Sequence, residues 1–175
     1  MEFNRLLSSA ISAYGEPNLT SIKNEVKIEK NQKAINKKEY YLIENLEQID
    51  NWITEAEELG EVAVDTETNS LDPHQADLVG VSLSSKIGKA CYIPIGHKSN
   101  KCIEKDLVLK KLKPLLEDPS IKKIGQNIKF DFIVFFKHGI NMTSMEDTML
   151  MSNVLDAGKN RHNMDTLSEI HLNHK

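Results

Sequence analysis

Two acidic side chains lie two residues apart in a segment that otherwise has the pattern of a half-buried strand. In the stretch "EVAVDTETNSLD", Val62 and Val64 alternate with other residues before Asp65 and Glu67 follow. Side chains at positions i and i+2 of a strand share a face, with their Cα atoms about 7 Å apart. Carboxylates this close repel each other unless a cation or solvent screens them. If the two acids bind a cation, their oxygen ligands suit Mg²⁺ or Mn²⁺ rather than zinc. The alternative is that the strand ends at Asp65 and both acids are solvated turn residues.

A third acid lies in an apolar segment farther along the chain. In "IGQNIKFDFIVFF", Asp131 follows Asn127 by four residues, which places both on one face near the start of a predicted helix. The residues after it are mostly aromatic or branched, and burying a carboxylate among them without a partner is unfavourable. The simpler interpretation is an exposed helix position beside buried phenylalanines. Asp147 in "MEDTML" is a further candidate, with an ordinary alternative as an acid near the first turn of a helix.

The elements that must position these acids begin near residue 40. Before them, apolar residues at helical spacing predict a short amphipathic helix over residues 2–13. The polar stretch that follows is rich in Lys and Asn and predicts a linker. We therefore expect an N-terminal helix and linker over residues 1–39 and a compact domain over residues 40–175.

The compact region combines strand and helix patterns. A short strand "YYLI" precedes a helix in "NLEQIDNWITEAEELG", which ends at Gly60. Three strands follow in "EVAVDTET", "DLVGVSLSS" and "KACYIPIG", and their short connections favour an antiparallel meander. Next come a helix that Pro114 should kink or interrupt, a short strand "IKKIGQN", and helices in "IKFDFIVFFKHG", "SMEDTMLMSNVLDAG" and "NMDTLSEIHLNHK". This order predicts an α/β or α+β layer fold around a mixed sheet.

The charge balance excludes a polybasic nucleic-acid binder. The 22 basic and 26 acidic residues give a net charge of −4, so any contact with phosphate must be local or mediated by a metal. The two cysteines have no disulfide or metal spacing, which fits a reducing compartment. No apolar run is long enough to span a membrane, and the N-terminal segment lacks a signal-peptide pattern. We expect a soluble, cytoplasmic protein with no membrane partner.

Five segments in unbroken order resemble the 3′–5′ proofreading exonuclease domain of bacterial DNA polymerase I, a family A polymerase whose domain belongs to the DnaQ-like superfamily. They are "VAVDTETNSLDPHQADLVGVSLS", "CYIPIGH", "LKPLLEDPSIKKIGQNIKFD", "DTMLMSNVLDAG" and "RHNMDTLSEIHLNHK", and the resemblance spans roughly residues 61–175. An ordered set of this kind is far more specific than one Asp-x-Glu. The resemblance implies an RNase H-like α/β fold with a mixed sheet flanked by helices. The opening "MEFNRLLSSA" also resembles the end of the 5′-nuclease region that precedes this domain.

The resemblance also implies roles for individual residues. Asp65 and Glu67 match the two metal-binding acids of the first family motif, and Asp131 matches the acid of the second. These three are the implied catalytic and metal-binding residues. The other matches concern the substrate. Leu71 matches an apolar residue that wedges against the terminal base, and Gln126 and Asn127 match positions at the terminal nucleotide and its backbone. Arg161 matches a basic residue near the phosphates. Phe130 stands where the relatives have Tyr.

The implied reaction is hydrolysis of the 3′-terminal phosphodiester of single-stranded DNA with two Mg²⁺ or Mn²⁺ ions. Ions about 4 Å apart lower the pKa of the attacking water and stabilise the leaving oxygen. Glu67 would orient the metal that carries the nucleophilic water, Asp65 would bridge both ions, and Asp131 would hold the second ion. A mismatched 3′ end unpairs more readily, so selectivity would come from melting rather than from base reading.

The resemblance further implies a fold and a site that are incomplete at the C-terminus. The third family motif, Tyr-x-x-x-Asp, would follow "LNHK", where this chain stops at Lys175. Loss of one acid should weaken metal binding and misplace the attacking water. We therefore expect little or no exonuclease activity from this chain alone, unless the rest of a split polymerase I completes it. The alternatives are a catalytically silent polymerase I remnant that binds DNA ends or has no function, and a related exonuclease that acts on RNA.

Overall fold

The computed structural model describes residues 4–15, 39–98 and 102–174, and the chain divides into two units between Lys33 and Ala34. In the first unit, α1 (Asn4–Tyr14) is helical, which confirms the helix predicted over residues 2–13 from residue 4 onward. The predicted linker falls on residues 16–38 for the most part and lies outside the described residues. The second unit carries all the candidate site residues.

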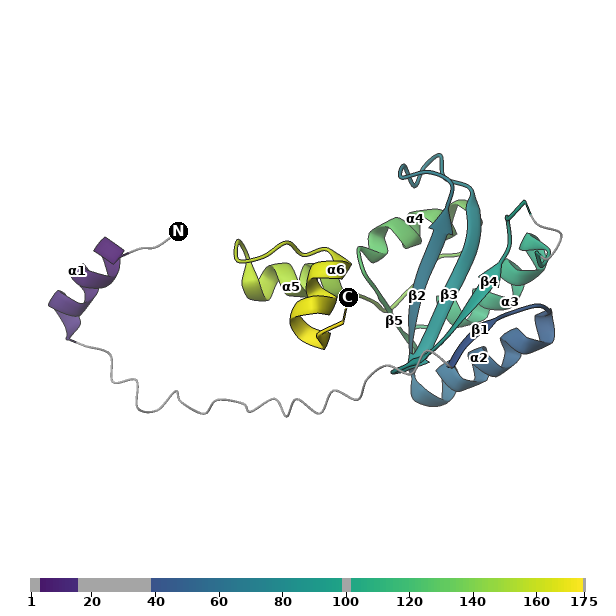
Figure 1. The fold of residues 1–175 in the computed structure, drawn as a ribbon, viewed down its shortest axis with the longest axis horizontal. Coiled ribbons are helices and arrows are strands. Elements are labelled where there is room, and N and C mark those ends of the chain that lie inside the picture. The colour runs from purple at the N-terminus through teal and green to yellow at the C-terminus, as the bar shows by residue number, and fades with distance from the viewer. Residues whose placement is uncertain (1–3, 16–38, 99–101, 175) are drawn as a thin grey trace. The chain divides into compact units, whose positions relative to one another are not determined.

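A mixed six-stranded sheet forms the centre of the second unit (Figure 1). Its strands run in the order β1-β4-β3-β2-β5-β6, and they are β1 (Tyr40–Leu42), β2 (Glu61–Thr68), β3 (Leu78–Lys86), β4 (Lys89–Pro94), β5 (Lys122–Gly125) and β6 (Met145–Asp147). The strands β2, β3 and β4 form the predicted antiparallel meander. The strand β1 joins β4, β5 joins β2 and β6 joins β5, each in parallel. This mixed sheet with flanking helices confirms the expected fold class.

The alternation of side chains along β2 decides which face of the sheet is the core. Val62, Val64 and Thr66 are buried, and the residues between them are more exposed. The hydrophobic core combines this strand face with buried side chains of three helices, α2 (Leu46–Leu59), α3 (Lys105–Glu117) and α4 (Ile128–Lys137). The sheet is therefore closed on one side by a packed helical layer.

The helices of this packed layer start and stop close to where their sequences predict. The side chain of Asn45 accepts a hydrogen bond from the backbone N–H of Gln48 at the start of α2, and Gly60 ends the helix with φ 72°. This left-handed conformation favours glycine. The helix α3 continues through Pro114 as far as Glu117, so the predicted interruption at the proline does not occur.

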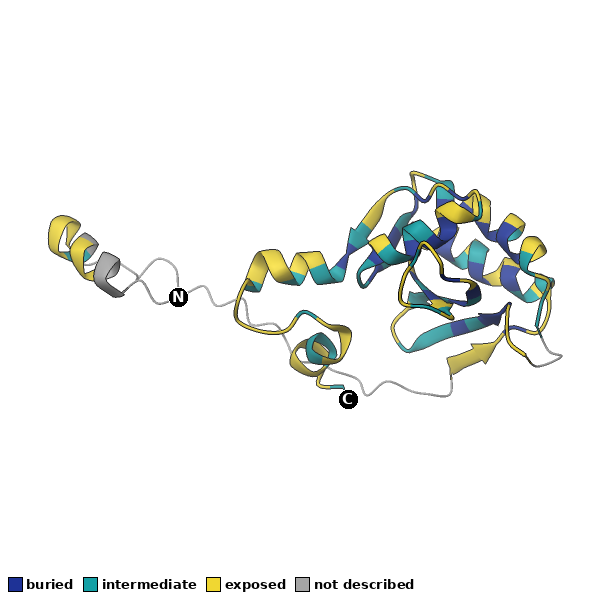
Figure 2. Ribbon diagram, turned by 90° about the horizontal axis from the view of Figure 1, so that it is seen from above, coloured by how far each residue is buried: buried dark blue, intermediate teal, exposed yellow. Residues whose placement is uncertain are grey.

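Three short helices lie over the other face of the sheet. They are α5 (Thr148–Asp156), α6 (Met164–Leu167) and the π-helical turn η3 (Ser168–Leu172), and none of their residues is buried. Figure 2 shows this C-terminal part mainly as exposed and intermediate residues, in contrast to the buried centre of the unit. The predicted final helix is confirmed, with Asn163 as its N-cap.

One predicted helix begins too early. The sequence places residues 144–158 in a single helix, whereas Met145–Asp147 form the edge strand β6, paired in parallel with β5. The helix α5 starts only after Asp147, whose side chain accepts hydrogen bonds from the backbone N–H groups of Met149 and Leu150. No helix in the described ranges is long and apolar enough to cross a membrane.

Candidate active site

The first two acids occupy the face of β2 that points away from the core. The strand β2 extends to Thr68, so Asp65 and Glu67 are both strand residues on one face. Asp65 is half-buried and Glu67 is exposed. The alternative in which the strand ends at Asp65 and both acids lie in a turn is therefore wrong. Each acid has a small residue opposite it on β3, since Asp65 pairs with Ser82 and Glu67 with Gly80.

The third acid reaches β2 from the packed helical layer. Pairing between β2 and β5 ends at Ala63 and Ile124, which leaves the following part of this β2 edge without a strand partner. Asp131, in the first turn of α4, lies at this edge and is 3% exposed. Its Oδ1 accepts hydrogen bonds from the backbone N–H of Thr66 at 2.8 Å and from Thr66 Oγ1 at 2.6 Å. The expected alternative of an exposed helix position is wrong, and the buried carboxylate has a specific partner.

Thr66 is a residue that the sequence analysis missed. It lies between the two acids of β2 but points to the opposite face, where it is 8% exposed. Its hydroxyl and its backbone N–H together hold Asp131 beside the strand. The available signal was its position, because strand alternation puts this polar residue on the core face, and buried polar groups require a hydrogen-bond partner.

Asp65 interacts electrostatically with each of the other two acids. Burial raises the pKa of Asp65, and the nearby charge of Glu67 raises it further. Burial also raises the pKa of Asp131 to about 6; the hydrogen bonds from Thr66 oppose this rise, and the charge of Asp65 adds to it. The carboxylate of Asp65 therefore lies within electrostatic range of both other acids. A divalent cation would relieve this repulsion and favour the ionised forms of Asp65 and Asp131.

The donor set fits a hard cation, but the side chains do not form a closed cage. The ion pairs in the described part of the chain join other residues, so none of the three acids has a basic partner there. Carboxylate oxygens are the ligands that Mg²⁺ and Mn²⁺ prefer. Across residues 4–15, 39–98 and 102–174, however, no three His, Cys, Asp or Glu side chains gather tightly enough to hold a metal ion.

Gln126 and Asn127 connect β5 to α4 beside the acids. Gln126 Nε2 donates to the backbone oxygen of His162 at 2.7 Å, and its Oε1 accepts from Thr148 Oγ1 at 2.6 Å. Asn127 adopts a left-handed conformation with φ 58°, which Asn tolerates better than most residues. Its backbone N–H donates to Asp147 Oδ1 at 3.0 Å. Both side chains are half-buried, and that of Gln126 is already engaged by the C-terminal segment.

Leu71 and Arg161 project from loops. Leu71 lies in the turn after β2 and is 96% exposed, so its side chain is free to meet a ligand. Arg161 is exposed in the segment between α5 and α6. The neighbouring His162 is anchored, because its Nδ1 lies 2.8 Å from Ser152 Oγ and its backbone oxygen accepts from Gln126.

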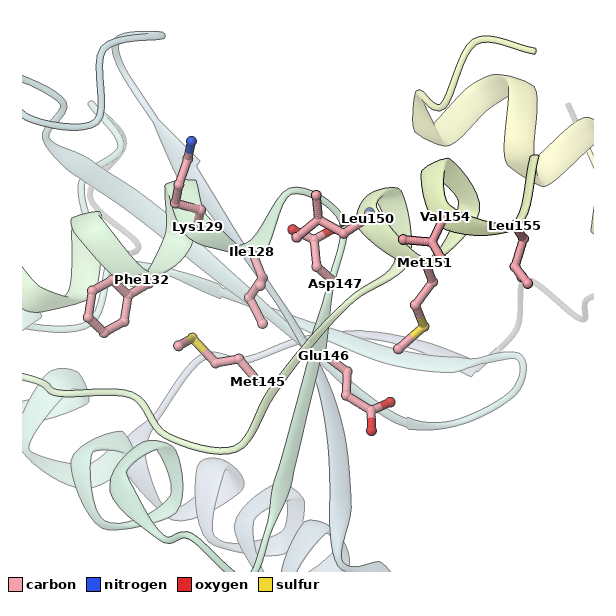
Figure 3. Close-up of a pocket in the computed structure, with 10 residues that line it drawn as sticks. All are labelled: Ile128, Lys129, Phe132, Met145, Glu146, Asp147, Leu150, Met151, Val154 and Leu155. Atoms are coloured by element: carbon pink, nitrogen blue, oxygen red, sulfur yellow. Dashed lines mark hydrogen bonds between the residues drawn. The ribbon is translucent and has the colours of Figure 1, made fainter. Parts of the chain in front are cut away.

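Asp147 serves the fold. It is 9% exposed, and its Oδ1 accepts from the backbone N–H groups of Asn127, Met149 and Leu150. This engagement confirms the ordinary alternative of an acid at a helix start. Figure 3 shows its carboxylate beside Leu150, at the edge of an apolar cavity of about 730 Å³ between α4, β6 and α5.

A second cavity joins the candidate site to the loosely covered face of the sheet. It has a volume of about 720 Å³ and lies between β2, β3 and β5 on one side and α5, α6 and η3 on the other. Asp65 and Gln126 lie on its wall, together with Ser82 and Ser84 of β3. Most of the remaining wall is apolar and comes from the C-terminal helices. The half-buried acid of β2 thus faces an open, partly apolar space.

The sequence and structure of this unit match known nucleases. Residues 40–175 match the model of the 3′–5′ exonuclease family. The chain is 43% identical to DNA polymerase I of Rhizobium leguminosarum over 157 residues, which cover 77% of this chain and 15% of the polymerase. It is 42% identical to DNA polymerase I of Pseudomonas aeruginosa over 131 residues, covering 71% of this chain and 14% of that polymerase. The chain thus spans about one seventh of the length of these relatives.

A solved nuclease structure has the same fold. Brucella melitensis NrnC bound to pGG matches with a TM-score of 0.60 and 27% identity over 78% of this chain and 61% of that chain. The same protein with bound Mg²⁺ matches with a TM-score of 0.59 and 28% identity over 78% of this chain and 62% of that chain. The expected RNase H-like fold is confirmed. The chain belongs to the 3′–5′ exonuclease family found in bacterial DNA polymerase I.

Proposed function

We propose that Asp65, Glu67 and Asp131 bind divalent Mg²⁺ or Mn²⁺ and that the site hydrolyses the 3′-terminal phosphodiester of single-stranded DNA. The observation that carries this proposal is the position of Asp65, which shares a face of β2 with Glu67 and directly precedes Thr66, the residue that binds Asp131. Three like charges from two elements are unfavourable unless a cation joins them. Membership of the exonuclease family and the Mg²⁺ in the NrnC structure support the same choice of metal.

Each acid has a role that follows from its surroundings. Bound divalent ions supply an activated water and stabilisation of the leaving oxygen. The charge of Asp65 interacts with that of each of the other two acids, so Asp65 would be the ligand best placed to serve both ions. Glu67 is exposed and can reach an ion on the solvent side, where water enters. Asp131 is fixed by Thr66 through one oxygen, which leaves the other for an ion or its water.

The substrate end would be received by residues around these acids. We assign Leu71 as an apolar contact for the terminal base, because its side chain is exposed at the end of β2. Gln126 and Asn127 border the start of α4 and are assigned to the terminal nucleotide. Arg161 is exposed in the segment tied to Gln126 through His162, and we assign it to the phosphates. The structure of NrnC bound to pGG supports the assignment of an oligonucleotide-binding site to this region.

Residues 40–175 would form the exonuclease domain, and residues 1–39 would precede it. The extent of the family match supports this division, although the division between the two units falls slightly earlier, at residues 33 and 34. In the longer relatives the matching region is part of a polymerase. We therefore propose that the domain proofreads in concert with the remaining parts of a polymerase I.

The 175 residues alone are expected to be weakly active or inactive. The acids in the described residues are not gathered into a cage, so the ions would bind weakly and the attacking water would be poorly placed. The test is the purified chain with Mn²⁺ or Mg²⁺ and a single strand labelled so that removal of its 3′ nucleotide is seen. We expect slow digestion at most, lost in Asp65→Asn. Robust digestion that survives Asp65→Asn would overturn both the site and the expectation.

A catalytically silent protein that binds DNA ends is the second candidate. The absence of a tight group of three metal-binding side chains among the described residues favours it. Titration with Mn²⁺, followed by electron paramagnetic resonance of the free ion, separates the two functions. Saturable binding that requires Asp65 and Glu67 supports the exonuclease. DNA-end binding without it supports the silent protein. The same titration and digestion with an RNA strand tests the third possibility, an RNA exonuclease.

A further inference from the structure

A tyrosine on β4 shares a face of the sheet with the acids of β2. Tyr92 pairs with Ser82 of β3, and Ser82 pairs with Asp65 of β2. Residues that pair directly across strands point to the same face. Tyr92 therefore stands in one cross-strand row with Asp65, two strands away, and its side chain is half-buried. The row places a phenol on the side of the sheet that carries the candidate site.

The phenol leans over a glycine toward Glu67. A Cβ atom built on Gly80 would lie 2.0 Å from Tyr92 Oη, so this oxygen occupies the space where a side chain at position 80 would begin. Gly80 pairs directly with Glu67, and Cβ atoms of such pairs lie about 4.5–5.5 Å apart. The Tyr92 hydroxyl thus lies over the residue that pairs with Glu67, within reach of the Glu67 side chain. Burial raises the pKa of Tyr92, and the charge of Glu67 raises it further, which agrees with this proximity.

A histidine fixes the orientation of the phenol. His97 Nε2 lies 2.6 Å from Tyr92 Oη, and the two rings meet edge to face with their centroids 5.6 Å apart. The backbone of His97 is held in turn, because its N–H donates to Cys102 Sγ at 3.2 Å and its backbone oxygen accepts from the thiol at 3.4 Å. If Nε2 carries its proton and donates to the phenol oxygen, the phenol hydrogen remains available for a carboxylate.

We propose that Tyr92 is a positioning residue for Glu67: the phenol, which lies 2.6 Å from the His97 imidazole, donates a hydrogen bond to the Glu67 carboxylate and so completes a chain from imidazole through phenol to carboxylate. It would restrict the exposed Glu67 side chain to the rotamers that face Asp65. The catalytic meaning of this arrangement rests on the proposed function. The hydrogen-bond chain itself does not, and it can be tested without metal or substrate.

The first test is nuclear magnetic resonance of the His97 ring nitrogens in the metal-free full chain. Glu67→Gln and Tyr92→Phe should both shift the Nε2 resonance, since the first replaces the charged acceptor by a weaker neutral one and the second removes the phenol. Glu61→Gln is the matched control, because Glu61 is exposed on the same face at the other end of β2. A His97 resonance that is as unaffected by Glu67→Gln as by Glu61→Gln would overturn the proposal.

The second test is the affinity for Mn²⁺ alone. Removal of an outer hydrogen bond to a metal ligand typically weakens binding 10- to 100-fold, so we expect about a 10-fold loss for Tyr92→Phe. His97→Phe should have a similar effect and His97→Gln a smaller one, since an amide restores a donor. Tyr41→Phe is the control, because this exposed tyrosine of β1 packs against Trp52 through its ring. The thermal midpoint of each variant verifies that it is folded.

The positioning role of Tyr92 and the proposed nuclease site can fail separately. Mn²⁺ affinity within twofold of the wild type in both Tyr92→Phe and Tyr41→Phe would overturn the positioning role and leave the nuclease site intact. If the wild type shows no Mn²⁺ binding that Asp65→Asn removes, the proposed function fails. The resonance test then decides alone whether the imidazole, phenol and carboxylate are connected.

Discussion

The two faces of the sheet differ in how their helices cover them. On the core face, α2, α3 and α4 contribute side chains that are completely enclosed, such as Leu112 and Phe135, each 0% exposed. On the other face, α5, α6 and η3 contribute none, and Val154 and Leu155 remain 84% and 79% exposed. The first layer supplies the apolar burial that stabilises the fold. The second layer forms the wall of an open space beside the acids.

The candidate site lies on the border between these two layers. Asp65 and Glu67 project from the loosely covered face, whereas Asp131 comes from the packed helix α4 and is held by Thr66 on the core side. The packed layer therefore fixes one of the proposed ligands, and the open layer leaves access to the other two. The packed layer thus stabilises the fold and also holds one acid of the candidate site, whereas the open layer contributes little apolar burial. The following predictions test that difference.

Amide hydrogen exchange should show the largest difference between the layers. Because no residue of α5 is buried and α3 carries five buried residues, local opening should be far easier in α5. We expect amides of α5 to exchange about 1000-fold faster than those of α3. Mass spectrometry or nuclear magnetic resonance of the full chain measures this ratio. Equal protection in the two helices would mean that the C-terminal layer is part of the cooperative core.

A matched pair of leucine truncations should differ next most. Leu112→Ala removes a fully buried side chain of α3, and such changes lower the free energy of unfolding by about 2–5 kcal/mol. Leu155→Ala makes the same chemical change in α5, where the side chain is exposed, and should stay within about 0.5 kcal/mol. Urea denaturation followed by circular dichroism provides both values. Comparable losses would remove the distinction between the layers.

Neutralising the buried acid should stabilise the metal-free protein. The folded-state pKa of Asp131 is about 6, above its usual 3.8. The contribution of this carboxyl to the free energy of unfolding is therefore fully present below pH 3.8 and is lost as the pH rises through 6. Asp131→Asn keeps an oxygen for Thr66 but carries no charge. At pH 8 in EDTA it should raise the free energy of unfolding by about 1–3 kcal/mol, with little gain at pH 4.

The control for this prediction is the wild type across the same pH range. As the pH falls from 8 to 5, protonation of Asp131 should raise the free energy of unfolding of the wild type toward that of Asp131→Asn. Thermal unfolding at several pH values measures both curves. A variant that is less stable than the wild type at pH 8 would show that the ionised carboxylate is well compensated without any cation.

Removing the hydroxyl that binds Asp131 should have the smallest of these effects. Thr66→Val keeps the shape of the side chain and the backbone N–H but deletes the 2.6 Å hydrogen bond. The loss should be about 1–2 kcal/mol at pH 8, because a hydrogen bond to a buried charged group is lost. Thr68→Val is a control on the same strand, since that hydroxyl donates to the backbone of Ser70 rather than to an acid. Equal losses in the two variants would contradict a special role for Thr66.

Much of the fold follows from local patterns in the sequence. The alternation of Val62 and Val64 predicted β2, and Gly60 marked the end of α2. Strand β6 escaped prediction because it has three residues, and Met145 and Glu146 favour helices when read alone. Its extended conformation comes from parallel pairing with β5, which no local pattern encodes.

The candidate site was predictable to a similar extent. The spacing of Asp65 and Glu67 established a shared face, and the apolar surroundings of Asp131 suggested a buried acid that needs a partner. The identity of that partner, Thr66, depends on where β5 stops pairing with β2. The approach of Tyr92 to Glu67 depends on the register of three strands and on a glycine between them. Both are long-range consequences of assembly.

Because the pairing of β5 with β2 ends early, Asp131 of α4 also affects how β2 is aligned in the sheet. Beyond Ala63, the edge of β2 is closed by a carboxylate rather than by a neighbouring backbone. A chain that assembled with β2 shifted by one residue would present the wrong amide and the wrong side-chain face to Asp131. A divalent ion that needs Asp131 would therefore bind only to the correctly aligned chain. Its binding would stabilise the native arrangement relative to misaligned ones.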